Sequence, residues 1–159
     1  MKKLLDIIEN NSRISAEKIA VMLDMKCEDV EKIIKKYEEE RVILGYKTLI
    51  NWEKTDVDKV TAFIELKVTP QFEQGFDAIA AKIYKYEQVK TVWLMSGSFD
   101  IGLIIEGKNM KDVALFVAEK LAPMNQVIST GTHFVLRTYK DFGVVFDKKT
   151  GDERGIVSL

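Results

Sequence analysis

Two short stretches in the C-terminal half of the chain carry polar groups that could bind a small molecule with an ammonium and a carboxylate. Gly97, Ser98 and Asp100 lie in one predicted turn, and Thr130 and Thr132 alternate onto one face of a predicted strand. The Asp100 carboxylate could accept a charge-assisted hydrogen bond from an ammonium, and the three hydroxyl groups could bind a carboxylate. Gly97 lacks a Cβ and would let the backbone approach such a ligand closely.

The same residue types also have a purely structural interpretation. Asp100 could be an Asx-type turn residue that supports a hairpin, because aspartate side chains often bond to nearby backbone groups. Thr130 and Thr132 could be present only because threonine is a good strand former. The sequence leaves both interpretations open.

A run of charged residues near position 30 is a second candidate site, in this case for nucleic acid. The candidate contacts are Lys26, Cys27, Glu28, Glu31, Lys32 and Lys35. Lysines could neutralise phosphates, and side chains at the start of a helix could read base edges. The acidic residues in the run would repel phosphates. The alternative is a solvated helix face, because Glu28–Lys32 and Glu31–Lys35 are favourable i, i+4 pairs that need no ligand.

The chain shows no pattern typical of a catalytic or metal site. His133 is the only histidine and is predicted to lie on the strand face opposite Thr130 and Thr132, with no partner at metal-ligand spacing. Cys27 is the only cysteine and could sense redox state from a helix start, where thiol pKa values are typically lowered, or be a small surface residue. We therefore predict no enzyme activity, no metal and no cofactor.

Composition limits the function further. The chain has 159 residues, of which 47% are hydrophobic, and a net charge of −1. Residues 1–50 hold ten Lys or Arg and ten Asp or Glu. DNA-reading domains are usually basic, so this balance is the main objection to DNA binding. No apolar run reaches the length of a membrane span, no secretory signal is evident, and a single cysteine suits a reducing cytoplasm.

The N-terminal third of the chain predicts three short helices, a stop at Gly45 and a strand. Helical spacing of apolar residues covers 2–10, 15–23 with Ser15 as N-cap, and a third helix after the turn at 24–26. Its buried stripe is formed by Val30, Ile33, Ile34 and Tyr37. Residues 42–50 are rich in β-branched and aromatic types and predict a strand. Two helices joined by a tight turn and packed on a first helix predict a helix-turn-helix.

From position 60 the pattern becomes mixed. Strands are predicted at 60–68, 89–96, 101–106 and 127–139, with helices at 72–86 and from an Asn109 cap to about 121. The second helix is expected to bury Met110, Val113, Ala114, Val117 and Leu121. This β-α-β-β-α-β order predicts a ferredoxin-like domain with an uncovered sheet face. Apolar residues on both faces, inferred from Phe63, Trp93, Leu103 and Phe134, predict a dimer formed through that face.

The predicted organisation is α+β, with an N-terminal helix-turn-helix domain followed by a ferredoxin-like domain. We expect a helix-turn-helix at 1–50, a hinge at 51–59, a ferredoxin-like effector and oligomerisation domain at 60–140, and a tail at 141–159. The tail predicts a β-hairpin with arms at 144–146 and 156–157 and its tip at 150–152.

This layout resembles the Lrp/AsnC family of feast/famine transcriptional regulators over about residues 2–140. The segments that carry the resemblance are Glu17–Ala20 with Leu23, Glu38–Tyr46, Gly97–Asp100, Thr130–Thr132 and Lys140. The resemblance implies a dimer that assembles further, often into octamers, and an amino-acid effector bound between subunits. Three departures matter: an acidic start of the recognition helix where the family usually has Ser, Thr, Arg or Pro, a longer tail, and Asp24 where the turn often has Gly. The last is minor, because aspartate tolerates the left-handed conformation.

We interpret the chain as a cytoplasmic, DNA-binding transcriptional regulator whose oligomeric state responds to a small molecule, with an amino acid as the expected effector. Its predicted partners are double-stranded DNA, an amino-acid-like molecule and further copies of itself, without a membrane. One alternative is a ligand-sensing oligomer of the same fold that lacks DNA binding. A second is an enzyme resembling the sirohaem decarboxylases, which share this two-domain layout but need histidines and basic residues that the chain does not offer.

Overall fold

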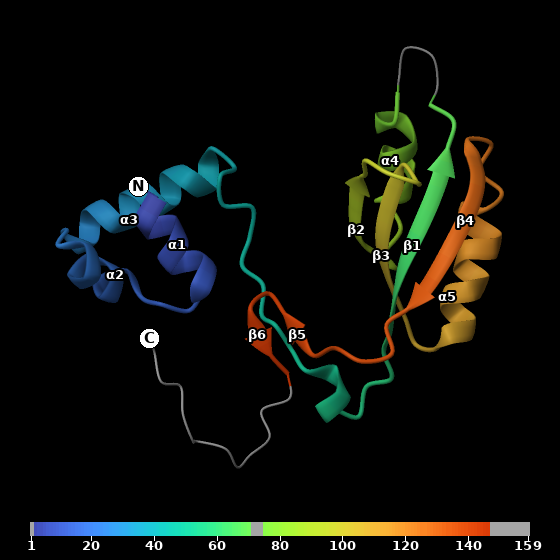
Figure 1. Cartoon of the computed structure of the whole chain (residues 1–159). Helices are drawn as coiled ribbons and strands as arrows, with labels where there is room; N and C mark the ends of the chain where they lie inside the picture. Colours follow the sequence, from blue (N-terminus) through green and yellow to red (C-terminus); the bar gives the residue numbers. More distant parts are fainter. Residues whose placement is uncertain (1, 71–74, 147–159) are drawn as a thin grey trace, which may run out of the picture. The chain divides into compact units, whose positions relative to one another are not determined.

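The computed structural model describes residues 2–70 and 75–146 and divides into two compact units, Met1–Ile50 and Asn51–Leu159 (Figure 1). The N-terminal unit contains the helices α1 (Lys2–Asn10), α2 (Ala16–Leu23) and α3 (Cys27–Glu39). The C-terminal unit contains a four-stranded sheet with helices and a short two-stranded sheet. The fold class is therefore α+β, as predicted, and the three N-terminal helices occupy the predicted positions.

The N-terminal helices enclose their own small core. Its buried residues are Leu4, Ile8, Ile19, Ala20, Val30 and Tyr37. Val30 and Tyr37 are the buried members of the α3 stripe, while Ile33 and Ile34 are half-buried against the same core. Because each helix contributes only one apolar stripe, none of the three could bury its stripe without the other two.

Local signals set the helix ends. The Ser15 hydroxyl accepts a hydrogen bond from the Lys18 amide, which makes Ser15 the N-cap of α2 as predicted. Helix α2 ends before Asp24, which adopts a left-handed conformation with φ of 52°. Beyond the end of α3, Arg41 has φ of 57°, while the Val42 amide bonds back to the Tyr37 carbonyl. This is a Schellman ending with a non-glycine residue.

The predicted stop at Gly45 and the predicted strand at 42–50 are both wrong. The helix has already ended at Glu39, and residues 44–50 have no regular secondary structure. A strand needs a neighbour for its backbone hydrogen bonds, and the described residues pair no strand with this segment. Tyr46 instead donates a hydrogen bond of 2.8 Å to Glu38 and so attaches the segment to the end of α3.

The C-terminal unit follows the order β-α-β-β-α-β. After a 3-10 helix, η1 (Trp52–Lys54), come β1 (Val60–Val68), α4 (Asp77–Ile83), β2 (Val89–Leu94), β3 (Ile101–Gly107), α5 (Met110–Phe116), a π-helical continuation η2 (Val117–Leu121) and β4 (Val127–Phe134). The strand order β2-β3-β1-β4 is antiparallel throughout and places β1 in the interior. This is the predicted ferredoxin-like topology.

Both helices of this unit cover one face of the sheet (Figure 1). Strand β1 alternates strictly, with Ala62, Ile64, Leu66 and Val68 buried and the residues between them more exposed. The buried set packs against Ile79 and Ile83 of α4 and against Val113, Phe116, Val117 and Leu121 from α5 and η2. The opposite face of the sheet has no helix over it within the part of the chain described.

Three element predictions need correction. Helix α4 spans Asp77–Ile83 and is shorter than the predicted helix at 72–86, because Gly75 has φ of 53°, outside the right-handed helical region. The predicted positions 72–74 lie outside the described residues. Strand β4 ends at Phe134 instead of residue 139, because Phe134, opposite Ala62, is the last residue paired with β1, and only one further bond follows, from the Val135 amide to the Thr61 carbonyl. Helix α5 buries Phe116, whereas the predicted Met110 and Ala114 are exposed.

The start of the tail forms a short hairpin in which β5 (Lys140–Asp141) pairs with β6 (Val144–Val145). This hairpin begins before the predicted tail boundary, and the predicted tip at 150–152 and second arm lie outside the described residues. Across residues 2–70 and 75–146, none of the helices has both the length and the apolar character needed to cross a membrane.

Ile64→Ala is expected to lower the free energy of unfolding by about 2–5 kcal/mol, because it leaves a cavity in the middle of the core. Ile64 is 0% exposed. The matched control is Ile128→Ala, which removes the same atoms from a side chain that is 62% exposed and should cost under about 1 kcal/mol. Urea unfolding of both variants at one protein concentration measures the difference. Equal decreases would contradict the assigned core.

Candidate functional site

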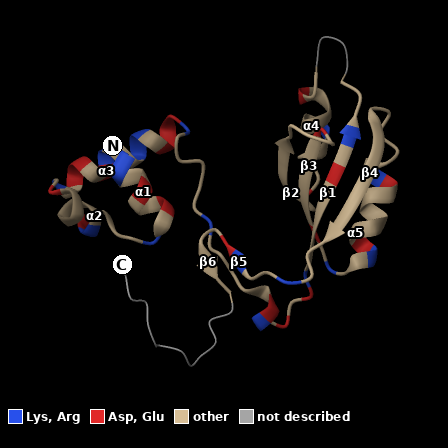
Figure 2. Ribbon diagram, in the orientation of Figure 1, with Lys and Arg blue, Asp and Glu red and all other residues tan. Residues whose placement is uncertain are grey.

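The predicted DNA contacts lie at the start of α3. Lys26 is the residue before the helix and offers no side-chain cap, Cys27 is half-buried, and Glu28, Glu31, Lys32 and Lys35 are exposed. The exposed stripe runs opposite Val30 and Tyr37 and mixes both signs of charge, which Figure 2 shows along the whole N-terminal unit. The start of this stripe could contact base edges in DNA, but the stripe is not a strongly basic surface.

The ion pairs on α3 differ from those predicted. Lys35 Nζ lies 4.0 Å from Glu39 and Lys36 Nζ lies 3.7 Å from Glu40, both exposed i, i+4 pairs. Of the predicted pairs, Glu28–Lys32 does not form among the described residues, and Lys35 pairs with Glu39 and not with Glu31. Because exposed pairs contribute under about 1 kcal/mol, both lysines remain available to phosphates.

Cys27 sits in acidic surroundings. Its Sγ lies 4.0 Å from a carboxylate oxygen of Glu31. Burial raises the pKa of the Cys27 thiol above its ordinary value, and the negative charges of Glu31, Glu17 and Glu28 raise it further. A thiol that stays protonated reacts slowly, so this environment disfavours the redox-sensing interpretation.

The turn at 97–100 is fastened to the central strand by Asp100. Its Oδ2 accepts a hydrogen bond of 2.8 Å from the Val68 amide, and its backbone amide donates to the Leu66 carbonyl at 3.0 Å. The structural interpretation of Asp100 therefore holds, although it supports β1 and not only its own hairpin. The second carboxylate oxygen could still accept a bond from a ligand.

Gly97 owes its place to backbone conformation. Its φ of 150° is unfavourable for residues with a side chain, whereas a Cβ there would meet no atom within 4 Å. The sequence-based reason, close approach of a ligand, is thus not needed to explain this glycine. Ser98 is exposed in the same turn.

Thr130 and Thr132 lie at the same end of the sheet as Asp100 but on a different strand. Leu66 pairs with Ile101 on one side and with Thr130 on the other, and Ile64 pairs with Thr132. Two strand spacings, about 10 Å, therefore separate Thr130 from the turn. Paired residues share a face, so both threonines lie on the side of Leu66 and Ile64. One chain does not bring Asp100 and the threonines to a single amino-acid head group.

The open face of the sheet is aromatic at its centre. The Phe63 ring makes an edge contact with Phe99 at 5.8 Å between centroids and a tilted contact with His133 at 6.2 Å. Gly102 leaves room for the ring, since a Cβ there would come within 3.1 Å of it. Trp93 pairs with Gly102 on the same face and is 47% exposed.

The four apolar residues from which the sequence predicts an association face are divided between the two faces of the sheet, as the prediction of apolar residues on both faces requires. Leu103 pairs with Ile64 and is fully buried beneath the helices, and Phe134 pairs with Ala62 and packs against the same core. Only Phe63 and Trp93 belong to the open face. Strand pairing decides which alternating residues share a face, and the sequence of separate strands does not contain that pairing.

His133 has a partner that sequence reasoning missed. Its Nε2 lies 3.3 Å from a Glu65 carboxylate oxygen on the neighbouring strand β1. Among the described residues, no group of three or more His, Cys, Asp or Glu could hold a metal ion. The Glu65–His133 pair therefore places a polar contact in the aromatic face without forming a metal site.

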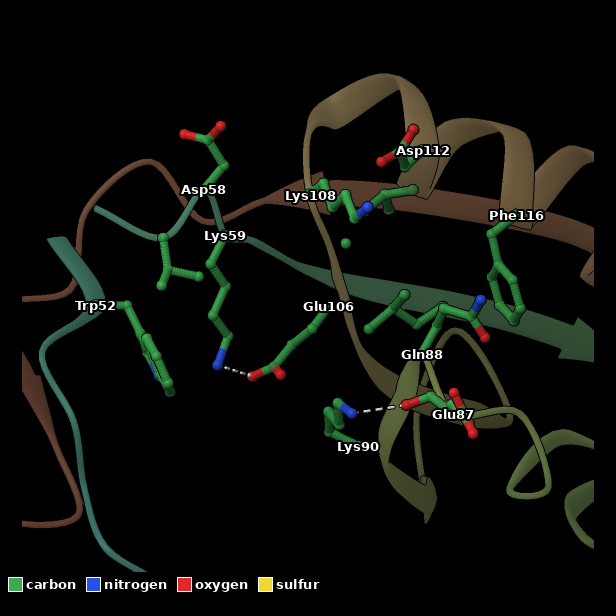
Figure 3. Close-up of a pocket in the computed structure, with 14 residues that line it drawn as sticks. Trp52, Asp58, Lys59, Glu87, Gln88, Lys90, Glu106, Lys108, Asp112 and Phe116 are labelled. Carbon is green, nitrogen blue, oxygen red and sulfur yellow. Dashed lines mark hydrogen bonds and ion pairs between the residues drawn. The ribbon is translucent and has the colours of Figure 1, made fainter. Parts of the chain in front are cut away.

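A separate cavity of about 600 Å³ lies at the opposite end of the sheet (Figure 3). Lys59 projects into it, with Nζ 2.8 Å from Glu106 and 4.7 Å from the centre of the Trp52 ring. Lys90 donates to the Glu87 carbonyl. The charges at its centre satisfy one another, and the contacts attach the 3-10 turn at Trp52 to the sheet. The contacts that line this cavity thus anchor the segment before β1.

Comparison with known proteins gives a consistent result. Residues 61–145 match the family model described as the Lrp/AsnC ligand binding domain. The chain is 44% identical over 157 residues to the HTH-type transcriptional regulator YugG of Bacillus subtilis strain 168, covering 98% of this chain and 95% of that protein. It is 27% identical to the leucine-responsive regulatory protein of Rhizobium meliloti strain 1021, covering 87% and 88%.

Solved structures share the fold. PH0061 matches with a TM-score of 0.76 at 19% identity, covering 91% of this chain and 95% of that one. The complex of the transcriptional regulator NMB0573 of Neisseria meningitidis with L-Met matches with a TM-score of 0.71 at 20% identity, covering 87% and 89%. At these identities the likeness shows a common architecture.

We expect the Cys27 thiol to react with iodoacetamide more slowly than free cysteine at the same pH, because a raised pKa leaves less thiolate. The reaction rate should rise with pH through a midpoint above the ordinary thiol value. Glu31→Gln should lower that midpoint and speed the reaction, whereas Glu39→Gln, further along α3, should not. Fast alkylation at neutral pH would contradict the assigned environment.

Proposed function

The chain belongs to the Lrp/AsnC family of HTH-type transcriptional regulators, and from this premise we propose that it binds DNA through α3 as an oligomer and responds to an amino acid. Its relatives are named transcriptional regulators, so the chain is a regulator with DNA as its partner and not an enzyme. The observation that carries the proposal is the exposed stripe of α3, which lies opposite the residues that α3 buries in the helix-turn-helix core.

DNA binding by one N-terminal unit is expected to be weak. Residues 1–50 have no net charge, and phosphate neutralisation supplies most of the sequence-independent affinity. Two or more units linked in one assembly compensate, because the first contact raises the effective concentration of the next. The aromatic open face around Phe63 and Trp93 is the surface that supports such an assembly, since exposed apolar patches on sheets favour association.

Replacing Lys32 and Lys35 together with alanine should weaken DNA binding across sequences. It should also reduce the slope of log K against log salt by about one for each phosphate that is no longer neutralised. Lys111→Ala combined with Lys120→Ala, which removes the same two charges from exposed positions on α5 and η2, is the control and should leave the slope unchanged. Fluorescence anisotropy with DNA from the upstream region of the protein's own gene measures both. If the wild-type chain retains no DNA, the ligand-sensing alternative replaces this proposal.

The effector proposal rests on the turn at 97–100. An amino acid needs an anion for its ammonium, and Asp100 keeps one carboxylate oxygen for that purpose while the other holds the Val68 amide. Since Thr130 and Thr132 lie two strands away, a carboxylate bound at the same turn would be met by Ser98, by turn amides or by a neighbouring subunit. A site completed by a neighbour would couple the ligand to assembly, because a ligand favours whichever state binds it better.

Asp100→Asn separates the two roles of this residue. The amide oxygen can still accept the bond from Val68, whereas the negative charge is removed. Amino-acid binding should weaken about tenfold or more, because bonds to charged groups contribute roughly 1.5–3 kcal/mol. Calorimetry and sedimentation velocity with a panel of L-amino acids, beginning with L-methionine, provide the measurement.

Asp77→Asn, an exposed substitution in the first turn of α4, is the matched control and should leave binding unchanged. Undiminished binding in Asp100→Asn would overturn the site assignment. Absence of any binding by the wild-type chain would overturn the effector proposal.

A further inference from the structure

We propose that Glu28 sets the base preference of this regulator by selecting cytosine in the DNA major groove, with Lys32 facing a guanine two base-pair steps away. The inference rests on the proposed function, since it assumes that α3 contacts DNA. The acidic start of α3, which would repel phosphates, then becomes a source of specificity.

Glu28 is well placed to reach a base edge. It lies in the first turn of α3 and is nine residues, or two and a half helical turns, before the buried Tyr37. It therefore points away from the helical core, half a turn from Val30 and Tyr37. Residues at the start of a recognition helix are those that reach base edges. Lys32 lies one turn further along the same exposed stripe.

Glu28 and Lys32 are also available for new contacts. Lys35 and Lys36 are paired with Glu39 and Glu40, and Glu31 lies beside the Cys27 thiol. Glu28 and Lys32 form no ion pair with any residue in the described ranges 2–70 and 75–146, although they are four residues apart. A base edge that offers a hydrogen-bond donor to Glu28 would therefore not have to displace an existing ion pair.

The chemistry of a carboxylate favours one base. A carboxylate only accepts hydrogen bonds, and cytosine is the base whose major-groove edge offers only a donor, its N4 amino group. Guanine presents two acceptors, thymine an acceptor and a methyl group, and adenine an acceptor beside its donor. Glu28 is repelled by the phosphates at every site, and only cytosine returns a bond that offsets this repulsion without also placing an acceptor beside the carboxylate. Wrong bases therefore leave an uncompensated charge at the interface.

Lys32 supplies the complementary contact. Its ammonium has three donors, which suit the O6 and N7 acceptors of guanine. Four helical residues rise about 6 Å, close to the spacing of two stacked base pairs at about 3.4 Å each. The stripe of one acidic and one basic side chain thus matches a cytosine and a guanine read along one groove.

The experiment is a binding selection from a randomised duplex library with the full-length chain, followed by sequencing. The wild-type chain should enrich a cytosine at one fixed position in each half-site, with about tenfold or greater discrimination when single-base variants are compared by anisotropy. Glu28→Gln should shift that position towards adenine, because a glutamine amide pairs bidentately with adenine N6 and N7.

Glu39→Gln is the matched control. It removes the same charge from the exposed side of the same helix, but near the helix end, where Glu39 pairs with Lys35. Both variants should bind more tightly overall because phosphate repulsion falls, yet only Glu28→Gln should change the preferred base. Both substitutions lie on exposed side chains, so unfolding is not expected, and circular dichroism checks it.

The possible outcomes distinguish this inference from the proposed function. An unchanged base preference in Glu28→Gln, with DNA still bound, overturns this inference and leaves the proposed function standing. An equal shift in Glu39→Gln also overturns it, because the effect would then be one of charge alone. Failure of the wild-type chain to bind any duplex overturns the proposed function and this inference together.

Discussion

The alternation of strand β1 is the constraint on which the C-terminal unit depends. Four of its side chains are buried under the helices, and the strand pairs with β3 on one side and β4 on the other. A slip of one residue would exchange the two faces, so burial of this set fixes the register of three strands at once. The same register places the Asp100 turn and Thr130 on either side of Leu66, and Phe63 at the centre of the open face. The candidate effector site and the candidate association surface are both consequences of one hydrophobic alternation.

Much of this arrangement could be predicted because the signals are local. Ser15 and Asn109 both accept the bond expected of an N-cap, and the strand at Val60–Val68 has the bounds that its alternation predicts. The errors arise where a distant partner decides the outcome. Residues 42–50 have strand-forming side chains but no pairing neighbour among the described residues, and β4 ends at Phe134, the last of its residues that pairs with β1. Propensity cannot supply either fact, because pairing is a property of the fold.

The site residues show the same division. The sequence indicates Asp100 as a turn residue and as a candidate ligand contact, but it does not reveal the Val68 amide, which is 32 residues away along the chain. Residue type groups Asp100 with Thr130 and Thr132, whereas the sheet order separates them by the width of β1. Leu103 and Phe134 lie on the covered face. The sequence could not show this, because alternation defines two sets of side chains without stating which set the helices cover. On α3, two favourable pairings are open to Lys35, and spacing alone cannot choose between Glu31 and Glu39.

The charge balance of the N-terminal unit links these surfaces to regulation. A strongly basic DNA-binding unit would bind DNA as a monomer, and the fraction of DNA bound would respond little to changes in assembly. With no net charge on residues 1–50, a single unit gains little from phosphates, and in the proposed function most of the affinity comes from several units acting together. DNA occupancy then depends steeply on the number of linked units. A ligand that shifts the assembly by a modest free energy would change DNA binding by a larger factor, because the change applies to every additional contact. An acidic recognition helix is therefore compatible with a regulator, provided that the C-terminal units hold its copies together.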